Sequence, residues 1–205
     1  MLIAPRNRGF TIIELMIAVA LFSVVLMLAI PSFTTMLQNA KLRAKAESIL
    51  AGLQEARTEA LKQNQTVEFL LMAEDPDPAN VAGFGANTAG PNWGVRVDAG
   101  GGAFSFVEGH NGLEGTGQAD PAALYAQITT ANLPGTNTVR FDGLGRTNVG
   151  AVNTTFDVKP AAAGECKADG GTKRCLRVVV TPGGRVRMCD PSVDGVANPG
   201  DTRAC

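Results

Sequence analysis

A single carboxylate, Glu14, lies in an otherwise apolar run of residues 10–30, and this run directly follows Arg6, Arg8 and Gly9. A charged side chain near the centre of a bilayer costs roughly 2.5 to 3.5 kcal/mol on insertion scales, so a membrane segment keeps one only where another interaction compensates. The chemistry that we expect of Glu14 is therefore charge pairing with another subunit.

Residues that would support catalysis are scarce in this chain. His110 is the only histidine, and its glycine-rich surroundings predict an exposed loop residue. The chain contains no recognisable nucleophile elbow and no phosphate-binding glycine motif. Asp75 and Asp77 form an acidic cluster with fewer ligands than a calcium loop needs, so we interpret it as a plain acidic turn. The sequence predicts no catalytic residue, no metal site and no cofactor.

Four cysteines, Cys166, Cys175, Cys189 and Cys205, lie in the last 40 residues. An even number gathered at one end indicates two disulfides in an oxidising compartment. Three pairings are possible and the sequence does not choose among them. We favour Cys166 with Cys175, which closes a short loop, and Cys189 with Cys205, which ties the tail to the last strand. A zinc site is the alternative, but the spacing lacks any C-x-x-C element.

The charges are unevenly distributed, although the net charge is only −1. Residues 63–165 hold four basic and eleven acidic side chains, whereas residues 166–205 hold seven basic and four acidic ones. Arg185 and Arg187 alternate along a predicted strand and so share one face about 7 Å apart, a spacing that suits neighbouring phosphates. Pairing of these arginines with acidic groups of the head or of a neighbouring subunit is the favoured interpretation. With no aromatic beside them on the hairpin, any DNA binding would be electrostatic and blind to sequence.

The elements that position these residues begin with a long helix. Residues 10–31 are long enough to span roughly 30 Å of hydrocarbon, which predicts a transmembrane or filament-core helix. A cleaved secretory signal is the alternative, but no small-residue cleavage site follows residue 30. Apolar residues then recur at three- and four-residue steps, which predicts an amphipathic helix over residues 32–62.

A β-rich head is predicted for residues 63–205. Low aromatic content (5%) and 24 glycines indicate an aliphatic core and many turns. Short β-branched or alternating runs separated by Gly, Pro, Asn and Asp predict antiparallel strands. These strands are expected at residues 66–72, 94–98, 104–108, 124–130, 138–142, 154–159, 175–181 and 185–189.

Residues 8–15 (RGFTIIEL) resemble the processing site of type IV prepilins and type II secretion pseudopilins. The resemblance implies that prepilin peptidase removes a leader of residues 1–9 by cutting after Gly9. It also implies that the new N-terminus, Phe10, is methylated, and that Glu14 acts in assembly. In a filament core of low dielectric, Glu14 and the amine of Phe10 of a neighbouring subunit would neutralise each other.

Two further stretches resemble the GspH/FimT branch of that family: residues 46–60 (AESILAGLQEARTEA), and residues 139–146 (VRFDGLGR) together with residues 184–187 (GRVR). The implied architecture is an α+β type IV pilin-like fold, in which a long N-terminal helix packs its distal half on two antiparallel β-sheets. The GRVR stretch also resembles a short motif with which some pilins of this branch bind DNA.

The resemblance implies a non-enzymatic protein anchored in the inner membrane by a single helix, with a periplasmic head that enters a filament. We expect a minor pilin that joins other minor pilins or pseudopilins through its N-terminal helix, in a complex that primes assembly of a type IV pilus and ends near the tip. The first alternative is the minor pseudopilin H of a type II secretion system. The second alternative is a DNA-binding minor pilin that acts in natural transformation.

Overall fold

The computed structural model describes residues 11–88, 90–112, 127–160, 164–197 and 199–205. The chain divides into two compact units, Met1–Leu37 and Gln38–Cys205. One helix, α1 (Ile12–Gln63), contributes to both units and runs for 52 residues. These bounds confirm the predicted helix to within one residue at its C-terminal end. The predicted leader and Phe10 lie outside the described residues.

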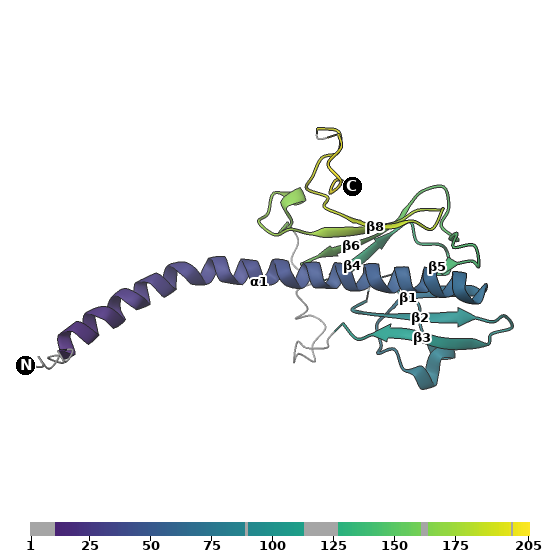
Figure 1. Cartoon of the computed structure of the whole chain (residues 1–205), viewed down its shortest axis with the longest axis horizontal. Coiled ribbons are helices and arrows are strands. Elements are labelled where there is room, and N and C mark those ends of the chain that lie inside the picture. The colour runs from purple at the N-terminus through teal and green to yellow at the C-terminus, as the bar shows by residue number, and fades with distance from the viewer. Residues whose placement is uncertain (1–10, 89, 113–126, 161–163, 198) are drawn as a thin grey trace, which may run out of the picture. The chain divides into compact units, whose positions relative to one another are not determined.

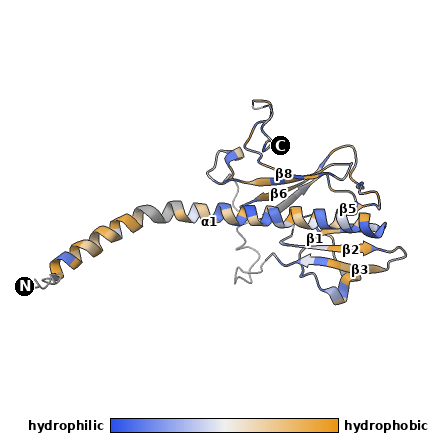
Figure 2. Ribbon diagram, viewed as in Figure 1, coloured by the Kyte–Doolittle hydropathy of each residue, from blue (hydrophilic) through white to orange (hydrophobic). Residues whose placement is uncertain are grey.

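In the first unit, the apolar side chains of the helix are exposed to solvent. Every residue of the stretch 11–27 is exposed, and Figure 2 shows the hydrophobic colour that dominates this part of α1. Among the described residues, no helix meets the length and apolarity that a membrane span requires. The membrane assignment of residues 10–31 therefore stays a prediction.

In the second unit, the helix buries one stripe of its surface. Its buried apolar residues recur every three or four positions, as an amphipathic helix requires: Leu42, Ala46, Ile49, Leu53, Ala56 and Ala60. Gly52 lies beside this stripe and against the indole of Trp93, where an added Cβ would come within 2.8 Å of a ring carbon. The small residues of α1 thus let the first sheet approach the helix closely.

The first sheet has the strand order β3-β2-β1-β5 and is antiparallel throughout. Its strands are β1 (Thr66–Met72), β2 (Asn92–Asp98), β3 (Phe104–His110) and β5 (Thr138–Phe141). The central strand β1 is buried on both faces because Val67, Phe69 and Leu71 join the main core, while Leu70 and Met72 pack with Phe84 in a second cluster. The short 3₁₀ helix η1 (Pro78–Gly83) precedes Phe84.

The second sheet has the strand order β4-β6-β7-β8 and is also antiparallel. Its strands are β4 (Gln127–Ala131), β6 (Thr154–Lys159), β7 (Leu176–Val180) and β8 (Val186–Cys189). A 3₁₀ turn, η3 (Lys167–Asp169), lies between β6 and β7. Figure 1 shows the two sheets flanking the second half of α1, which confirms the α+β architecture.

One core joins the helix and both sheets. The ring of Phe69 on β1 lies 5.7 Å from the ring of Trp93 on β2 and 5.7 Å from the ring of Phe156 on β6. All three residues belong to the same buried cluster as the apolar stripe of α1. All eight predicted strands have an observed counterpart, and residues 66–72 and 154–159 match exactly. The predicted strand at 124–130 begins among residues 124–126, which lie outside the described part.

Candidate functional site

The first candidate site is the N-terminal end of α1. The backbone N–H of Glu14 donates a hydrogen bond to the hydroxyl of Thr11 at 3.3 Å, so Thr11 caps the helix. Glu14 lies in the first turn, where the positive end of the helix dipole favours a carboxylate. Gly9 and Phe10 lie outside the described residues, so leader cleavage and methylation stay predictions.

On both sides of Glu14 along the chain, α1 displays an apolar surface. Its large exposed side chains are Ile12, Ile13, Leu15, Met16, Ile17, Val19, Leu21, Phe22, Val24, Val25, Leu26 and Met27. A contiguous exposed apolar surface of this kind marks a site of association with protein or lipid. This part of the helix therefore provides apolar contact together with a single acidic group.

The second candidate site is the disulfide-linked C-terminal region. The structure pairs Cys166 with Cys175 and Cys189 with Cys205, with Cα–Cα distances of 5.4 Å and 5.1 Å. This is the pairing favoured from the sequence, and all four cysteines are used. The first bridge closes the turn that contains η3, and the second attaches the tail to the end of β8.

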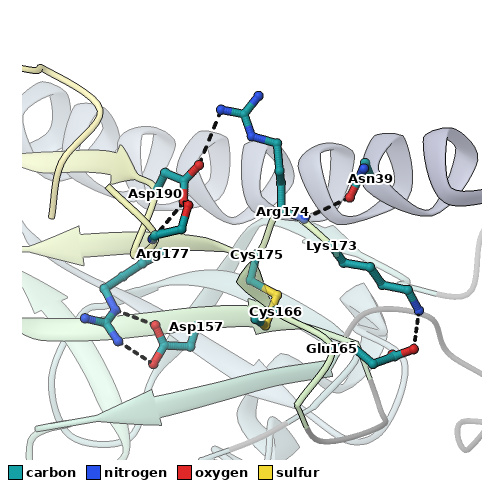
Figure 3. The surroundings of a disulfide bond; sticks show 10 residues. Asn39, Asp157, Glu165, Cys166, Lys173, Arg174, Cys175, Arg177 and Asp190 are labelled. Carbon is teal, nitrogen blue, oxygen red and sulfur yellow. Dashed lines mark hydrogen bonds and ion pairs between the residues drawn. A yellow bond between two sulfur atoms is a disulfide. The ribbon is translucent and has the colours of Figure 1, made fainter. Parts of the chain in front are cut away.

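Ion pairs surround the Cys166–Cys175 bridge (Figure 3). Arg177 binds Asp157 through two nitrogens across the β6–β7 pair, and this hydrogen-bonded contact raises the pKa of Arg177. Lys173 donates to Glu165 at 2.6 Å. The backbone N–H of Arg174 donates to the side-chain oxygen of Asn39 at 2.9 Å, so the bridged loop is held against α1.

The two arginines of the predicted DNA-binding face have different environments. Arg185 is exposed and lies in the turn just before β8. Arg187 lies within β8, is half-buried, and donates to the carbonyl oxygens of Ala204 at 2.9 Å and Cys205 at 2.8 Å. The guanidinium of Arg187 therefore binds the C-terminal tail. Of the two arginines predicted to contact DNA, only Arg185 is exposed.

A buried charge cluster on the first sheet was not predicted. Glu68 is completely buried on β1, and it accepts hydrogen bonds from Arg96 Nε at 2.8 Å and Arg140 Nε at 2.5 Å. Arg96 also donates to the carbonyl of Val81 and lies over the ring of Phe104. The available signal was a lone glutamate inside the apolar run of residues 66–72, which needs a cationic partner when buried.

A second buried cation, Lys45, was also missed. It lies on α1, and its ammonium donates a hydrogen bond to the carbonyl oxygen of Pro91. Burial lowers the pKa of Lys45 to about 8, because desolvation disfavours the charged form. Its position within the helical apolar periodicity, next to the buried Ala46, was the sequence signal.

The remaining residues considered for chemistry have structural surroundings. The prediction that His110 is an exposed loop residue is wrong. His110 is the last residue of β3, and its ring stacks on the ring of Trp93, with the ring centroids 5.7 Å apart. Asp75 accepts a hydrogen bond from the side chain of Asn92, and Asp77 caps η1. Within the described ranges, no group of three or more His, Cys, Asp or Glu side chains is arranged to hold a metal ion.

Comparison with known proteins places these features in a family. A model of the family described as Type II transport protein GspH matches residues 45–184. A model of the prokaryotic N-terminal methylation motif matches residues 4–30. Together the two matches include most of α1 with the segment that contains Glu14, the whole first sheet, and all of the second sheet except β8.

A curated pilin and a minor pilin solved in two crystal forms are similar to parts of the chain. The type IV major pilin protein PilA of Myxococcus xanthus (strain DK1622) is 36% identical over 95 residues, which are 46% of this chain and 39% of that pilin. The type IV minor pilin FimU of Pseudomonas aeruginosa (strain PAO1), in two crystal forms, is 15% identical. The first form matches 73% of this chain and 88% of FimU with a TM-score of 0.49, and the second matches 71% and 90% with a TM-score of 0.46.

The GspH model alone matches more than half of the chain, and the methylation motif occupies the segment in front of it. The protein therefore belongs to the GspH family of type IV pilin-like proteins.

Proposed function

We propose that this chain is a minor pilin that prepilin peptidase processes between Gly9 and Phe10, and that it takes part in assembling a type IV pilus as a priming or tip subunit. The observation that carries the proposal is the exposed apolar stretch of α1 with Glu14 in its first turn. Before assembly, this stretch holds the protein in the inner membrane with the head in the periplasm. The role is structural and needs no catalytic residue.

In the filament, the carboxylate of Glu14 pairs with the free amine of Phe10 on a neighbouring subunit. Two opposite charges in an environment of low dielectric attract strongly, and each relieves the desolvation cost of the other. The pairing also sets the axial register between helices. The remaining apolar side chains of residues 12–27 supply contact area along the same helix.

The test is a Glu14→Ala variant of the full-length chain. It should insert into the inner membrane at least as well as the parent, because a membrane cost is removed. It should be absent from sheared filaments. A Ser23→Ala variant on the same exposed helix is the matched control and should assemble normally. Equal amounts of Glu14→Ala and parent protein in sheared filaments would refute the proposed role of this carboxylate.

A second candidate, the minor pseudopilin H of a type II secretion system, is favoured by the description of the family whose model matches residues 45–184. Deleting the gene separates the two functions. Loss of surface pili with normal release of exoproteins supports the pilus assignment, whereas retained pili with exoproteins trapped in the periplasm support secretion.

DNA binding in natural transformation is a third candidate, and it now depends on Arg185. Counterion release would make such binding steeply salt-dependent and independent of sequence. A gel shift of the full-length protein with two unrelated duplexes at two salt concentrations tests it. Replacing Arg185 by Gln should abolish any shift if this arginine binds phosphate.

A further inference from the structure

Three segments meet at the end of α1: the last turns of the helix, the β5–β6 loop and the β7–β8 turn. An ideal Cβ placed on Gly145 would lie 3.1 Å from Arg57 Nε and 3.3 Å from Leu61 Cδ2. One placed on Gly184 would lie 1.8 Å from the carbonyl oxygen of Gly145. The backbone N–H of Thr147 also donates to the carbonyl of Pro182 at 3.1 Å. Both contact glycines have positive φ, so this close junction suits glycine alone at these positions.

The junction displays two apolar side chains. Leu144 is 69% exposed and Leu61 is 49% exposed. The loop that carries Leu144 is fixed, because Asp142 accepts hydrogen bonds from the backbone N–H of Leu144 at 3.0 Å and of Arg146 at 2.9 Å. The same contacts lower the pKa of Asp142. An apolar side chain on a fixed turn loses little conformational entropy on binding, which favours a docking role.

Cations surround these leucines. Arg57 is half-buried on the same face of α1 as Leu61, and its Nε is buried without a hydrogen-bond partner in the part of the chain that the structure describes. Arg185 is exposed and directly follows the contact glycine Gly184. Arg146 is largely exposed and pairs with Asp142 at 3.1 Å. Three guanidinium groups and one carboxylate give this area a positive balance that acidic groups of a partner would meet.

We propose that this helix-end surface, formed by Arg57, Leu61, Leu144, Arg146 and Arg185, docks a segment of another protein that carries carboxylates beside apolar side chains. Arginine presents a planar fork that binds a carboxylate through two parallel hydrogen bonds. Arginine is enriched among the residues that dominate binding energy at protein interfaces, and burial of an exposed leucine side chain adds a hydrophobic contribution.

The apolar component distinguishes a protein partner from a nucleic acid. A phosphate backbone offers nothing to Leu61 and Leu144, and none of the five surface residues is aromatic, so none can stack on a base. The proposal concerns the head and is independent of the pairing of Glu14. It therefore holds for a pilus subunit and for a secretion pseudopilin alike.

The test measures binding of short labelled peptides to the full-length chain in detergent micelles by fluorescence anisotropy. The probe alternates glutamate and leucine; one control peptide has lysine for glutamate and another has serine for leucine. The probe should bind saturably at low salt and both control peptides should not. Leu144→Ser and Arg185→Gln should each weaken binding at least about fivefold, since each removes an exposed anchor without disturbing the core.

Matched control variants lie outside the surface. Val196→Ser removes a side chain that is 91% exposed, and Arg203→Gln removes an exposed cation; both should bind the probe like the parent. Disulfide content measured by thiol labelling verifies that every variant is folded. The proposal is overturned if the probe does not saturate, or if the two sets of variants bind it equally. The proposal is also overturned if duplex DNA displaces the probe and if binding of that DNA requires Arg185 but not Leu144.

Discussion

Arg96 lies directly opposite Glu68 across β1 and β2, and its Nε donates to a Glu68 carboxylate oxygen at 2.8 Å in an environment closed to solvent. On the other side of β1, Arg140 lies opposite the same glutamate. Three charged residues thus form a row across three adjacent strands. A register shift of one residue would turn the glutamate to the other face, so the row specifies strand alignment as well as stability.

Replacing Glu68 by Gln should destabilise the head strongly. The variant leaves the buried Arg96 without its carboxylate, and breaking a buried ion pair from one side typically costs about 3 to 5 kcal/mol. Urea unfolding of the full-length protein, followed by the fluorescence of Trp93 in the core, measures the loss. Asp201→Asn, which breaks the more exposed pair with Arg203, is the control and should shift the midpoint little. Equal midpoints for the two variants would contradict a structural role for Glu68.

Stability should rise with pH above pH 8 because of Lys45. Its pKa is about 8 in the folded head against 10.5 ordinarily, so between these values the unfolded chain binds the extra proton. Stability is therefore gained as pH rises from about 8 to 10.5, by up to about 3 kcal/mol. Unfolding free energies of the parent and of Lys45→Met at several pH values test this. The slope should be present in the parent and much reduced in the variant; parallel curves would show that Lys45 does not titrate in this way.

Gly52 should tolerate no larger residue. An added Cβ would come within 2.9 Å of three atoms of the Trp93 ring, so Gly52→Val should overpack the contact between α1 and β2 at a cost of about 1 to 3 kcal/mol. Ala51→Val, on the exposed face one residue earlier, is the control and should cost about 0.5 kcal/mol or less. Thermal unfolding and the emission spectrum of Trp93 measure both. An unchanged spectrum in Gly52→Val would argue against this close packing.

The native, oxidised protein should contain no reactive thiol, since its four cysteines form two bridges. Replacing Cys205 by Ser should release the tail and free the guanidinium of Arg187 from the carbonyls of residues 204 and 205. Closing a loop of this size is worth about 2 to 4 kcal/mol. Unfolding by urea measures the loss, and limited proteolysis should cleave the tail of the variant first. A tail equally resistant in both proteins would mean that other contacts retain it.

The sequence predicted elements well wherever local pattern governs them. The period of α1 and the alternation of residues 154–159 each reflect burial of one face, whereas the apolar run of residues 66–72 reflects a strand buried on both faces. These elements were located correctly. The end of β3 was missed because His110 is held in the strand by stacking on Trp93, a contact from a neighbouring strand. The strand propensity of a single residue does not include a contact with a residue on a neighbouring strand.

The residues of the candidate sites divide in the same way: contacts within a short segment were predicted, and contacts between distant segments were not. The structure confirms the favoured pairing of the four cysteines. The sequence could indicate this pairing because each bridge closes a short local segment. The pairing of Glu68 with Arg140, 72 residues apart, depends on sheet order, which alternation does not specify. Arg185 and Arg187 were placed in one hairpin correctly, but the tail that binds Arg187 is held at the end of β8 by the Cys189–Cys205 bridge and by a backbone hydrogen bond from Asp190 to Arg203, and alternation along a strand specifies neither.

The contact of Phe69 with both Trp93 and Phe156 has a consequence for how the head opens. Because one aromatic side chain belongs to the packing of both sheets, neither sheet separates from α1 without exposing the ring that supports the other. The slowest-exchanging amides of β1 and β6 should therefore exchange through a single cooperative opening, with one free energy, rather than as two independent foldons.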